Sequence, residues 1–319
     1  MTRTTWAEVP TTVRRALEEA LGDQVEEAAS QSGGFSSGSA DRLVLRSGRR
    51  VFAKSVSRSR NAVTHELHRR EAAVVRGLPA SVSAPRVVAT VEQDDWVVVA
   101  FEDVDGRHPG PDDTTLVLDA LAELPRMTEA SLLPRLPDEL RPDATSWERL
   151  SSAGAAGELD PWTTAHLDQL RDASAQLPGA AAGEHLVHLD CRADNFLLDA
   201  SSRVWLVDWP WASVGAPWFD SVTYLLDVLV RDPRSDVEGH LLRDSLREVP
   251  PEAVDAVLAG LAGSWTEASR EAHYENICAI DGRIMLAGEH VSMIPAWQEG
   301  AVLSSLDAIT RLHKRVLQG

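Results

Sequence analysis

The chain has 319 residues, of which 44% are hydrophobic, and its 31 basic and 49 acidic residues give a formal charge of −18. This composition is that of a globular protein and excludes a disordered tail, while the length favours two lobes over one small core. The acidic excess argues against a nucleic-acid partner, because such a surface repels phosphate backbones. It could attract a cationic small substrate, or it could serve only solubility.

The sequence carries no signal for export or membrane insertion. A basic stretch followed by an apolar run is absent from the N-terminus, and no apolar run reaches the roughly 18 residues needed to span a bilayer. Cys191 and Cys278 form no spacing motif, so neither a disulfide framework nor a zinc site is expected. We therefore expect a protein of the reducing cytoplasm without a membrane partner.

The first hundred residues predict a small antiparallel sheet. Helical spacing predicts a helix over 11–21, and a Gly/Ser-rich stretch at 30–39 lies between two strand-like segments. Alternating patterns predict strands over 41–46 and 50–56, joined as a hairpin by a turn at Ser47-Gly48. Gly77 and Pro79 close a helix over 62–77, and two more strands follow over 86–91 and 96–101.

After Gly106 the pattern becomes mainly helical. We expect two short strands at 196–198 and 204–207, leave 129–160 without assignment, and predict helices over 116–128, 162–177, 219–230, 251–269, 273–290 and 301–317. The predicted domains are therefore an N-terminal lobe, residues 1–105, and a C-terminal lobe, residues 106–319.

One segment combines two carboxylates and an amide at a spacing that is typical of a catalytic site. It reads His188-Leu-Asp-Cys-Arg-Ala-Asp-Asn195, and the strand of Val204-Trp-Leu-Val-Asp-Trp209 brings a further carboxylate, Asp208. Phosphoryl transfer needs a carboxylate that orients and deprotonates the attacking hydroxyl, together with oxygen ligands for magnesium. An Asp, an Asn shortly after it, and an Asp at the end of the next strand supply these groups in protein kinases.

These residues resemble the aminoglycoside phosphotransferase family, which shares the protein-kinase fold. The family pattern H-x-D-x-x-x-x-N, a strand ending in I/V-D-W, and G-x-P-x-x-D is matched, the last part by Gly215-Ala-Pro-Trp-Phe-Asp220. The resemblance implies an α+β, protein-kinase-like two-lobe fold with a small antiparallel-sheet N-lobe and a larger, mainly helical C-lobe. It also implies that Asp190 is the catalytic base, that Asn195 and Asp208 hold Mg²⁺, and that His188 and Asp220 support the catalytic loop.

The N-terminal half supplies candidates for nucleotide binding. Lys54, in Val-Phe-Ala-Lys, resembles the kinase lysine that binds the α- and β-phosphates, and the resemblance makes Glu71 its partner in preference to Glu66. A Gly/Ser loop with Gly34, Ser36 and Ser37 would cover the phosphates of the nucleotide. By the same resemblance, backbone groups near Glu102 and Val104, in the hinge that follows the last predicted strand of the N-lobe, would bind the adenine ring.

The predicted function is transfer of the γ-phosphoryl group of ATP or GTP to a hydroxyl of a small molecule, such as an aminoglycoside antibiotic. The alternatives are a metabolic kinase of a sugar, choline-like amine or amino alcohol, a nucleotide-binding pseudokinase, and a metallohydrolase. Core or lobe packing is the favoured interpretation for Trp209, Trp211 and Trp218. Trp147 and Trp162 could stack on a sugar acceptor, although core packing is favoured for them as well. By analogy with the family, the C-terminal helices offer candidate acceptor contacts, namely Glu275, Asp281, Glu289 and His290.

Overall fold

The computed structural model describes residues 4–31, 38–128, 131–152 and 159–268. Its internal contacts divide the chain into two compact units. The first unit combines Met1–Ala120 with Asp190–Ala212, and the second combines Leu121–Leu189 with the described residues from Ser213 onward. The lobe boundary expected after residue 105 stays a prediction.

The first unit is built on a five-stranded sheet in the order β1-β2-β3-β5-β4, in which all neighbours pair antiparallel. The strands are β1 (Val25–Ser30), β2 (Ser39–Leu45), β3 (Arg50–Ser57), β4 (Val87–Gln93) and β5 (Trp96–Glu102). This confirms the predicted hairpin and sheet, with each predicted strand within two residues of its observed bounds. The turn between β2 and β3 needs glycine, because Gly48 has φ of +84°.

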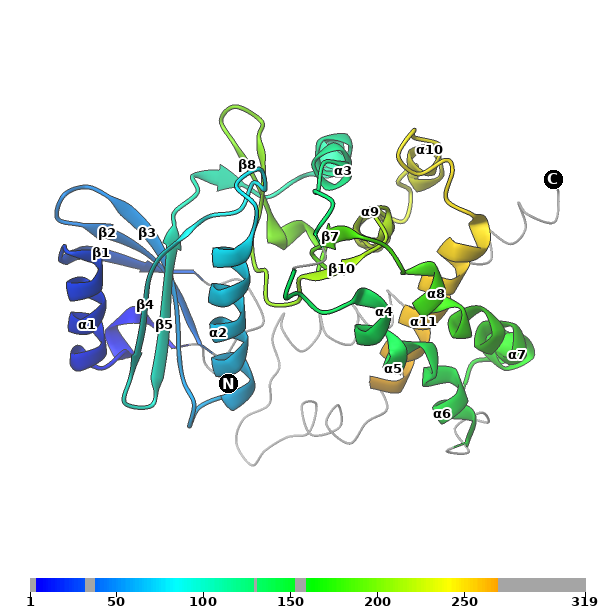
Figure 1. Ribbon diagram of the computed structural model, residues 1–319, viewed down its shortest axis with the longest axis horizontal. Helices are drawn as coiled ribbons and strands as arrows, with labels where there is room; N and C mark the ends of the chain where they lie inside the picture. The colour runs from blue at the N-terminus through cyan, green and yellow to red at the C-terminus, as the bar shows by residue number, and fades with distance from the viewer. Residues whose placement is uncertain (1–3, 32–37, 129–130, 153–158, 269–319) are drawn as a thin grey trace. The chain divides into compact units, whose positions relative to one another are not determined.

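Two helices lie on the sheet, α1 (Thr11–Leu21) and α2 (Ala62–Gly77), as Figure 1 shows. Successive residues of a strand point to opposite faces. Val51 and Ala53 of β3 are therefore buried in the core that α1 covers, while Phe52 and Lys54 face the other side. The strand alternation thus presents the lysine away from the apolar core.

A second, three-stranded sheet in this unit has the order β6-β8-β9, with β6 (Gly106–Arg107), β8 (Phe196–Asp199) and β9 (Val204–Leu206). Gly106 permits the close approach of β6 to β8, because a Cβ there would lie 2.9 Å from the Leu198 carbonyl oxygen. Strands β8 and β9 lie within the segment 190–212, so that Asn195 directly precedes β8 and Asp208 follows β9.

The second unit is mainly helical. Its elements include α4 (Leu136–Glu139), α5 (Arg141–Ala144), α6 (Ser146–Ser152), α7 (Pro161–Ala175), α8 (Leu177–Ala180), α9 (Phe219–Arg231), α10 (Val237–Leu241) and α11 (Pro251–Ala268), with a two-stranded ribbon of β7 (His185–Val187) and β10 (Ser213–Gly215). Trp147 is fully buried and its indole N–H donates to the Ala259 carbonyl at 2.8 Å. Gly263 of α11 makes room for this indole, since a Cβ there would lie 2.8 Å from Trp147 Nε1.

One predicted helix was too long. The helix predicted over 116–128 is observed as α3 (Thr114–Ala122). Pro125 has no N–H to donate and its ring disfavours helical backbone at Leu124, so the helix ends before them. The helices predicted over 273–290 and 301–317 lie outside the described residues.

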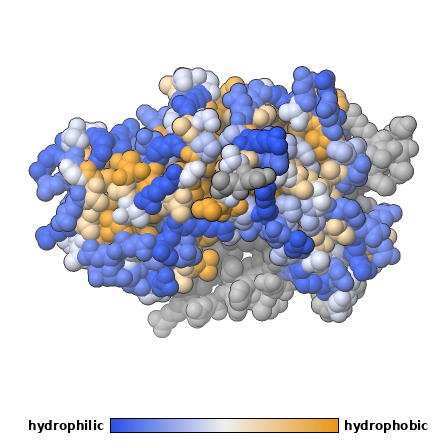
Figure 2. Space-filling model, viewed as in Figure 1, coloured by the Kyte–Doolittle hydropathy of each residue, from blue (hydrophilic) through white to orange (hydrophobic). Residues whose placement is uncertain are grey.

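Most of the surface in the view of Figure 2 is hydrophilic, with smaller apolar areas between the polar side chains. Among the described residues no helix combines the length and the apolar character that crossing a membrane would require.

Candidate functional site

The strand end before the motif is fixed by a buried carboxylate. Asp220, in the first turn of α9, accepts hydrogen bonds from the backbone N–H groups of His188 at 2.6 Å and Leu189 at 3.0 Å. His188 is fully buried, and Leu189 has a left-handed φ of +70°, which non-glycine residues rarely adopt. Asp220 therefore stabilises a strained turn directly before Asp190.

Asp190 and Asn195 are hydrogen-bonded to each other. The Asn195 Nδ2 donates to the Asp190 carbonyl oxygen at 2.9 Å and to its Oδ2 at 2.8 Å. Because both partners are acceptors, the amide nitrogen must face Asp190, which leaves Asn195 Oδ1 for a different partner. A short 3-10 turn over Ala193–Asn195 brings the two side chains together.

Asp208 follows β9 and also has left-handed backbone, with φ of +67°. Such strain at a non-glycine residue costs on the order of 1–3 kcal/mol and is often found at functional sites. The Asp208 side chain is 44% exposed, and its Oδ1 lies 2.9 Å from the Lys54 ammonium.

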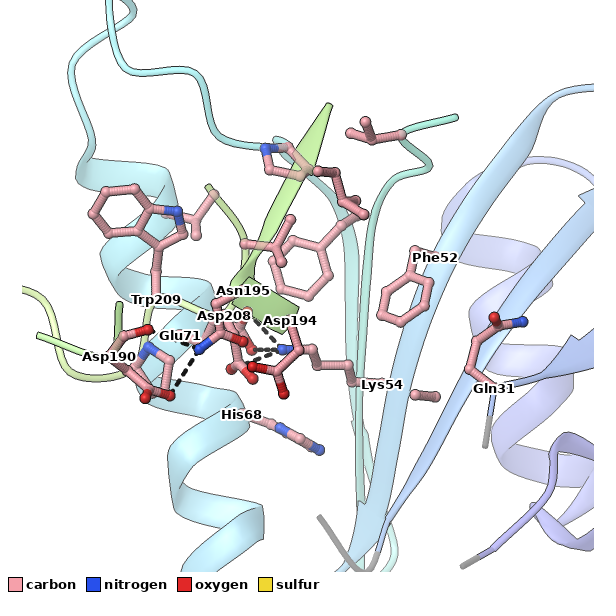
Figure 3. A pocket seen from close by; sticks show the side chains of 18 of the residues that line it. Gln31, Phe52, Lys54, His68, Glu71, Asp190, Asp194, Asn195, Asp208 and Trp209 are labelled. Carbon is pink, nitrogen blue, oxygen red and sulfur yellow. Dashed lines mark hydrogen bonds and ion pairs between the residues drawn. The ribbon is translucent and has the colours of Figure 1, made fainter. Parts of the chain in front are cut away.

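The expected pair of Lys54 and Glu71 is present. Lys54 Nζ lies 2.8 Å from both carboxylate oxygens of Glu71, and Figure 3 shows the ammonium between Glu71 and Asp208. Glu66, the competing partner, instead pairs with Arg69 at the surface. The preference for Glu71 was therefore correct.

Burial and the neighbouring charges shift the pKa values of Lys54 and Glu71 in opposite directions. Burial lowers the pKa of Lys54, but the carboxylates of Asp208 and Glu71 outweigh it, and the pKa is raised overall. Burial raises the pKa of Glu71 to about 7, although the ammonium opposes that rise. Lys54 is thus firmly cationic while it is held by two carboxylates.

A second cation lies beside the motif carboxylate. Arg192 donates to both oxygens of Asp194, at 3.1 and 2.8 Å, and its Nε lies 3.7 Å from Asp190 Oδ1. The Asp194 side chain is 44% exposed to solvent and orients this arginine from there. The family pattern leaves both positions free, so no spacing signal could have identified the pair.

These residues line one cavity of about 540 Å³ within the first unit. The charged groups described above lie close together (Figure 3), and the lining also includes apolar side chains, among them Phe52, Phe101, Leu197 and Val207. The hinge residues Glu102 and Val104 also line it. Between them, the side chain of Asp103 is 2% exposed and pairs with Arg50 at 2.8 Å and Arg42 at 3.5 Å, which fixes the hinge to the sheet.

His108, Arg192 and Trp211 are among the lining residues that were not identified as site residues from the sequence. Trp209 is buried in the core as expected, whereas Trp211 is 38% exposed and lies under the Arg70 guanidinium, 5.5 Å from the ring centroid. Trp211 is therefore not part of the core and packs instead against Arg70 of α2. Exposure of an aromatic ring depends on tertiary packing, and sequence pattern does not report it.

Several expected site residues lie outside the described residues. They are Gly34, Ser36 and Ser37 of the Gly/Ser loop and Glu275, Asp281, Glu289 and His290 of the C-terminal helices.

The oxygen groups of this cavity suit magnesium. Within the described part of the chain no group of three or more His, Cys, Asp and Glu residues could hold a metal ion. Mg²⁺ characteristically takes only one or two protein carboxylates and completes its shell with phosphates and water. The Asp208 carboxylate and the Asn195 amide oxygen fit that requirement.

Comparison with known proteins identifies the family. Residues 33–267, well over half of the chain, match the phosphotransferase enzyme family.

The chain belongs to the phosphotransferase enzyme family.

Solved structures with the same fold include several phosphotransferases. A thermostable mutant of aminoglycoside phosphotransferase APH(4)-Ia, in complex with ADP and hygromycin B, is 17% identical, with a TM-score of 0.57 over 95% of this chain and 99% of that one. Spectinomycin phosphotransferase APH(9)-Ia, with ADP and spectinomycin, is 13% identical, with a TM-score of 0.56 over 92% and 97%. Choline kinase LicA from Streptococcus pneumoniae is 14% identical, with a TM-score of 0.53 over 92% and 100%.

These findings confirm the predicted resemblance and the α+β, protein-kinase-like fold of this phosphotransferase. The roles of its individual site residues stay predictions.

Proposed function

We propose that this phosphotransferase moves the γ-phosphoryl group of ATP or GTP to a hydroxyl of a small molecule, with an aminoglycoside-type antibiotic as the first candidate acceptor. The observation that carries the proposal is the shared cavity of Lys54, Glu71, Asp190, Asn195 and Asp208. Such a set joins a phosphate-binding cation, a base and metal ligands around one space. Similar solved structures hold ADP with hygromycin B or with spectinomycin.

In this proposal the Lys54 ammonium gives up its contact with Asp208 and binds the α- and β-phosphates of the nucleotide. Glu71 keeps its ion pair with Lys54 and so holds the ammonium in position. Asp208 and the Asn195 Oδ1 hold Mg²⁺, which neutralises phosphate charge when bound. The hinge backbone at Glu102 and Val104 would contact the adenine or guanine ring of the nucleotide.

Asp190 acts on the acceptor. Its carboxylate orients the hydroxyl and takes the proton, while the hydroxyl oxygen forms a bond to the γ-phosphorus and the bond from that phosphorus to the β-γ bridging oxygen breaks. The products are a phosphorylated acceptor and the nucleoside diphosphate. Asn195 holds the Asp190 carboxylate by hydrogen bonding, which restricts its rotamer before the acceptor binds.

The test is a coupled assay of nucleoside-diphosphate release over aminoglycosides, other antibiotics, sugars and amines, followed by the product's mass. We expect a mass gain of one phosphoryl group on a hydroxylated compound, and loss of that gain in Asp190→Ala. Asp168→Ala, a change at a 94% exposed carboxylate in the second unit, is the matched control and should retain activity. Nucleotide binding without transfer to any acceptor would contradict the proposal and favour a pseudokinase.

A metabolic role is the second candidate, since a choline kinase shares the fold. The same screen separates the two candidates: turnover of choline-like amines or amino alcohols in preference to antibiotics would select the metabolic kinase. The net charge of −18 favours a cationic acceptor in both cases. Raising the ionic strength should then increase the acceptor KM, because exposed charges are screened beyond about 10 Å at 0.1 M salt.

A further inference from the structure

The chain makes a tight turn over residues 209–212, directly after Asp208. The Ala212 N–H donates to the Trp209 carbonyl at 3.3 Å, and Pro210 at the second position supplies the backbone angle that such turns favour. Trp209 anchors the turn, since its ring is 1% exposed and its indole N–H donates to a backbone carbonyl of β9 at 2.9 Å. Trp211, two residues later, is 38% exposed and therefore lies on the outer side of the turn.

The 209–212 turn contacts helix α2 at two adjacent residues. The Trp209 backbone N–H donates to the Glu71 carboxylate. The Arg70 guanidinium lies over the Trp211 ring, 5.5 Å from its centroid. Successive residues of a helix are about 100° apart around its axis, so Glu71 can face the buried Lys54 while Arg70 reaches the outer side of the turn.

Only one member of the outer contact reaches the cavity. Among the described residues that line the cavity, Trp211 is included and Arg70 is not. A change of Arg70 can therefore affect a bound nucleotide or metal ion only indirectly, through the elements that Arg70 touches. This separates a positioning effect from a direct contact with the ligand.

The Lys54 ammonium also joins the turn to the helix, because it lies 2.8 Å from Glu71 and 2.9 Å from Asp208. In the proposed function this bridge opens on the Asp208 side when the ammonium binds the phosphates. Asp208 must then be held by other contacts at the moment when it takes up Mg²⁺. Its left-handed backbone increases that need, since a strained residue keeps its conformation only where its surroundings enforce it.

We propose that Arg70 and Trp211 are positioning residues, whose cation–π contact holds the 209–212 turn, and with it Asp208, against α2 while Lys54 binds the phosphates. This inference rests on the proposed function, because it requires nucleotide at Lys54 and Mg²⁺ at Asp208. The contact acts on the metal step. Nucleotide binding without Mg²⁺ does not depend on it, whereas the gain in nucleotide affinity that Mg²⁺ brings does.

The test measures ADP affinity by calorimetric titration with Mg²⁺ and again in excess chelator, with GDP in parallel. The quantity compared is the magnesium gain, which is the dissociation constant in chelator divided by that with Mg²⁺. A partly exposed cation–π contact corresponds to about a 2- to 5-fold effect on an equilibrium, so Arg70→Gln should lower the magnesium gain about 2- to 5-fold. The affinity of Arg70→Gln for ADP in chelator should equal that of the wild type.

Further variants show whether the two residues act as a pair. Trp211→Leu should lower the magnesium gain by the same factor, and the double variant should lower it no further, because each change removes the same contact. Arg70→Lys keeps a cation and Trp211→Phe keeps an aromatic face, so each should retain most of the gain. Arg76→Gln makes the same charge change at an exposed residue of α2 that contacts Thr90, and this matched control should keep the wild-type gain.

The possible outcomes separate this inference from the proposed function. An Arg70→Gln protein that keeps the full magnesium gain, or a double variant whose loss is the product of the two single losses, overturns the inference alone. Equal losses of ADP affinity with Mg²⁺ and in chelator also overturn it, because the contact would then support the nucleotide site as a whole. A wild type that binds neither ADP nor GDP, or that binds them equally well with and without Mg²⁺, overturns the proposed function together with it.

Discussion

Replacing Glu71 by glutamine keeps the shape of the side chain but removes a carboxylate that is 4% exposed. Burial raises the pKa of Glu71 from 4.5 to about 7 in the folded protein. A raised pKa means that the folded state holds its proton more tightly than the unfolded state does. The stabilisation from this group is therefore fully present below about pH 4.5 and is lost as the pH rises through about 7.

The magnitude follows from the two pKa values. Each pKa unit corresponds to about 1.4 kcal/mol, so the rise from 4.5 to about 7 amounts to about 3 kcal/mol. The free energy of unfolding of the nucleotide-free wild type, measured relative to Glu71→Gln, should fall by roughly that amount between pH 4.5 and 7.5. Urea denaturation of both proteins at a series of pH values measures this difference.

Glu66→Gln provides the control on the same helix. The Glu66 side chain is 63% exposed and pairs with Arg69 at the surface, so its loss should change the free energy of unfolding by less than about 1 kcal/mol. If the wild type and Glu71→Gln give parallel curves from pH 4.5 to 7.5, the reasoning from burial is refuted.

Lys54→Met should weaken ATP or GTP binding and lower turnover, because it removes the phosphate-binding cation and leaves Glu71 buried without its ammonium; unchanged nucleotide affinity by calorimetry would contradict the assignment. Asp208→Asn should lose metal-dependent turnover, measured by titrating Mg²⁺ into the assay, and full wild-type activity in excess chelator would exclude the metal role. Trp147→Phe should lower the free energy of unfolding by about 1–3 kcal/mol, since the Ala259 carbonyl loses its buried donor. Nucleotide affinity of Trp147→Phe should stay unchanged, and an affinity loss without destabilisation would argue against a purely structural tryptophan.

Local signals in the sequence were sufficient for the elements and for the motif. Alternation along β3 correctly assigned Lys54 to a strand, and Gly77 and Pro79 correctly marked the C-terminal end of α2. The choice of Glu71 over Glu66, which the family resemblance implied, also held. Asp190, Asn195, Asp208 and Asp220 were recognisable because their spacing along one chain segment is itself the signal.

The sequence by itself thus determined the fold class, the family resemblance and the motif that unites them. The tertiary structure alone decided which side chains outside the motif reach the cavity, such as His108, which follows the paired strand β6, and Arg192, which is held by its ion pair with Asp194. It also exposed Trp211 while burying Trp209 two residues earlier. Spacing along the chain records periodicity and motif, whereas burial and side-chain partners arise from segments distant in sequence, and so these features appear only once the chain has folded.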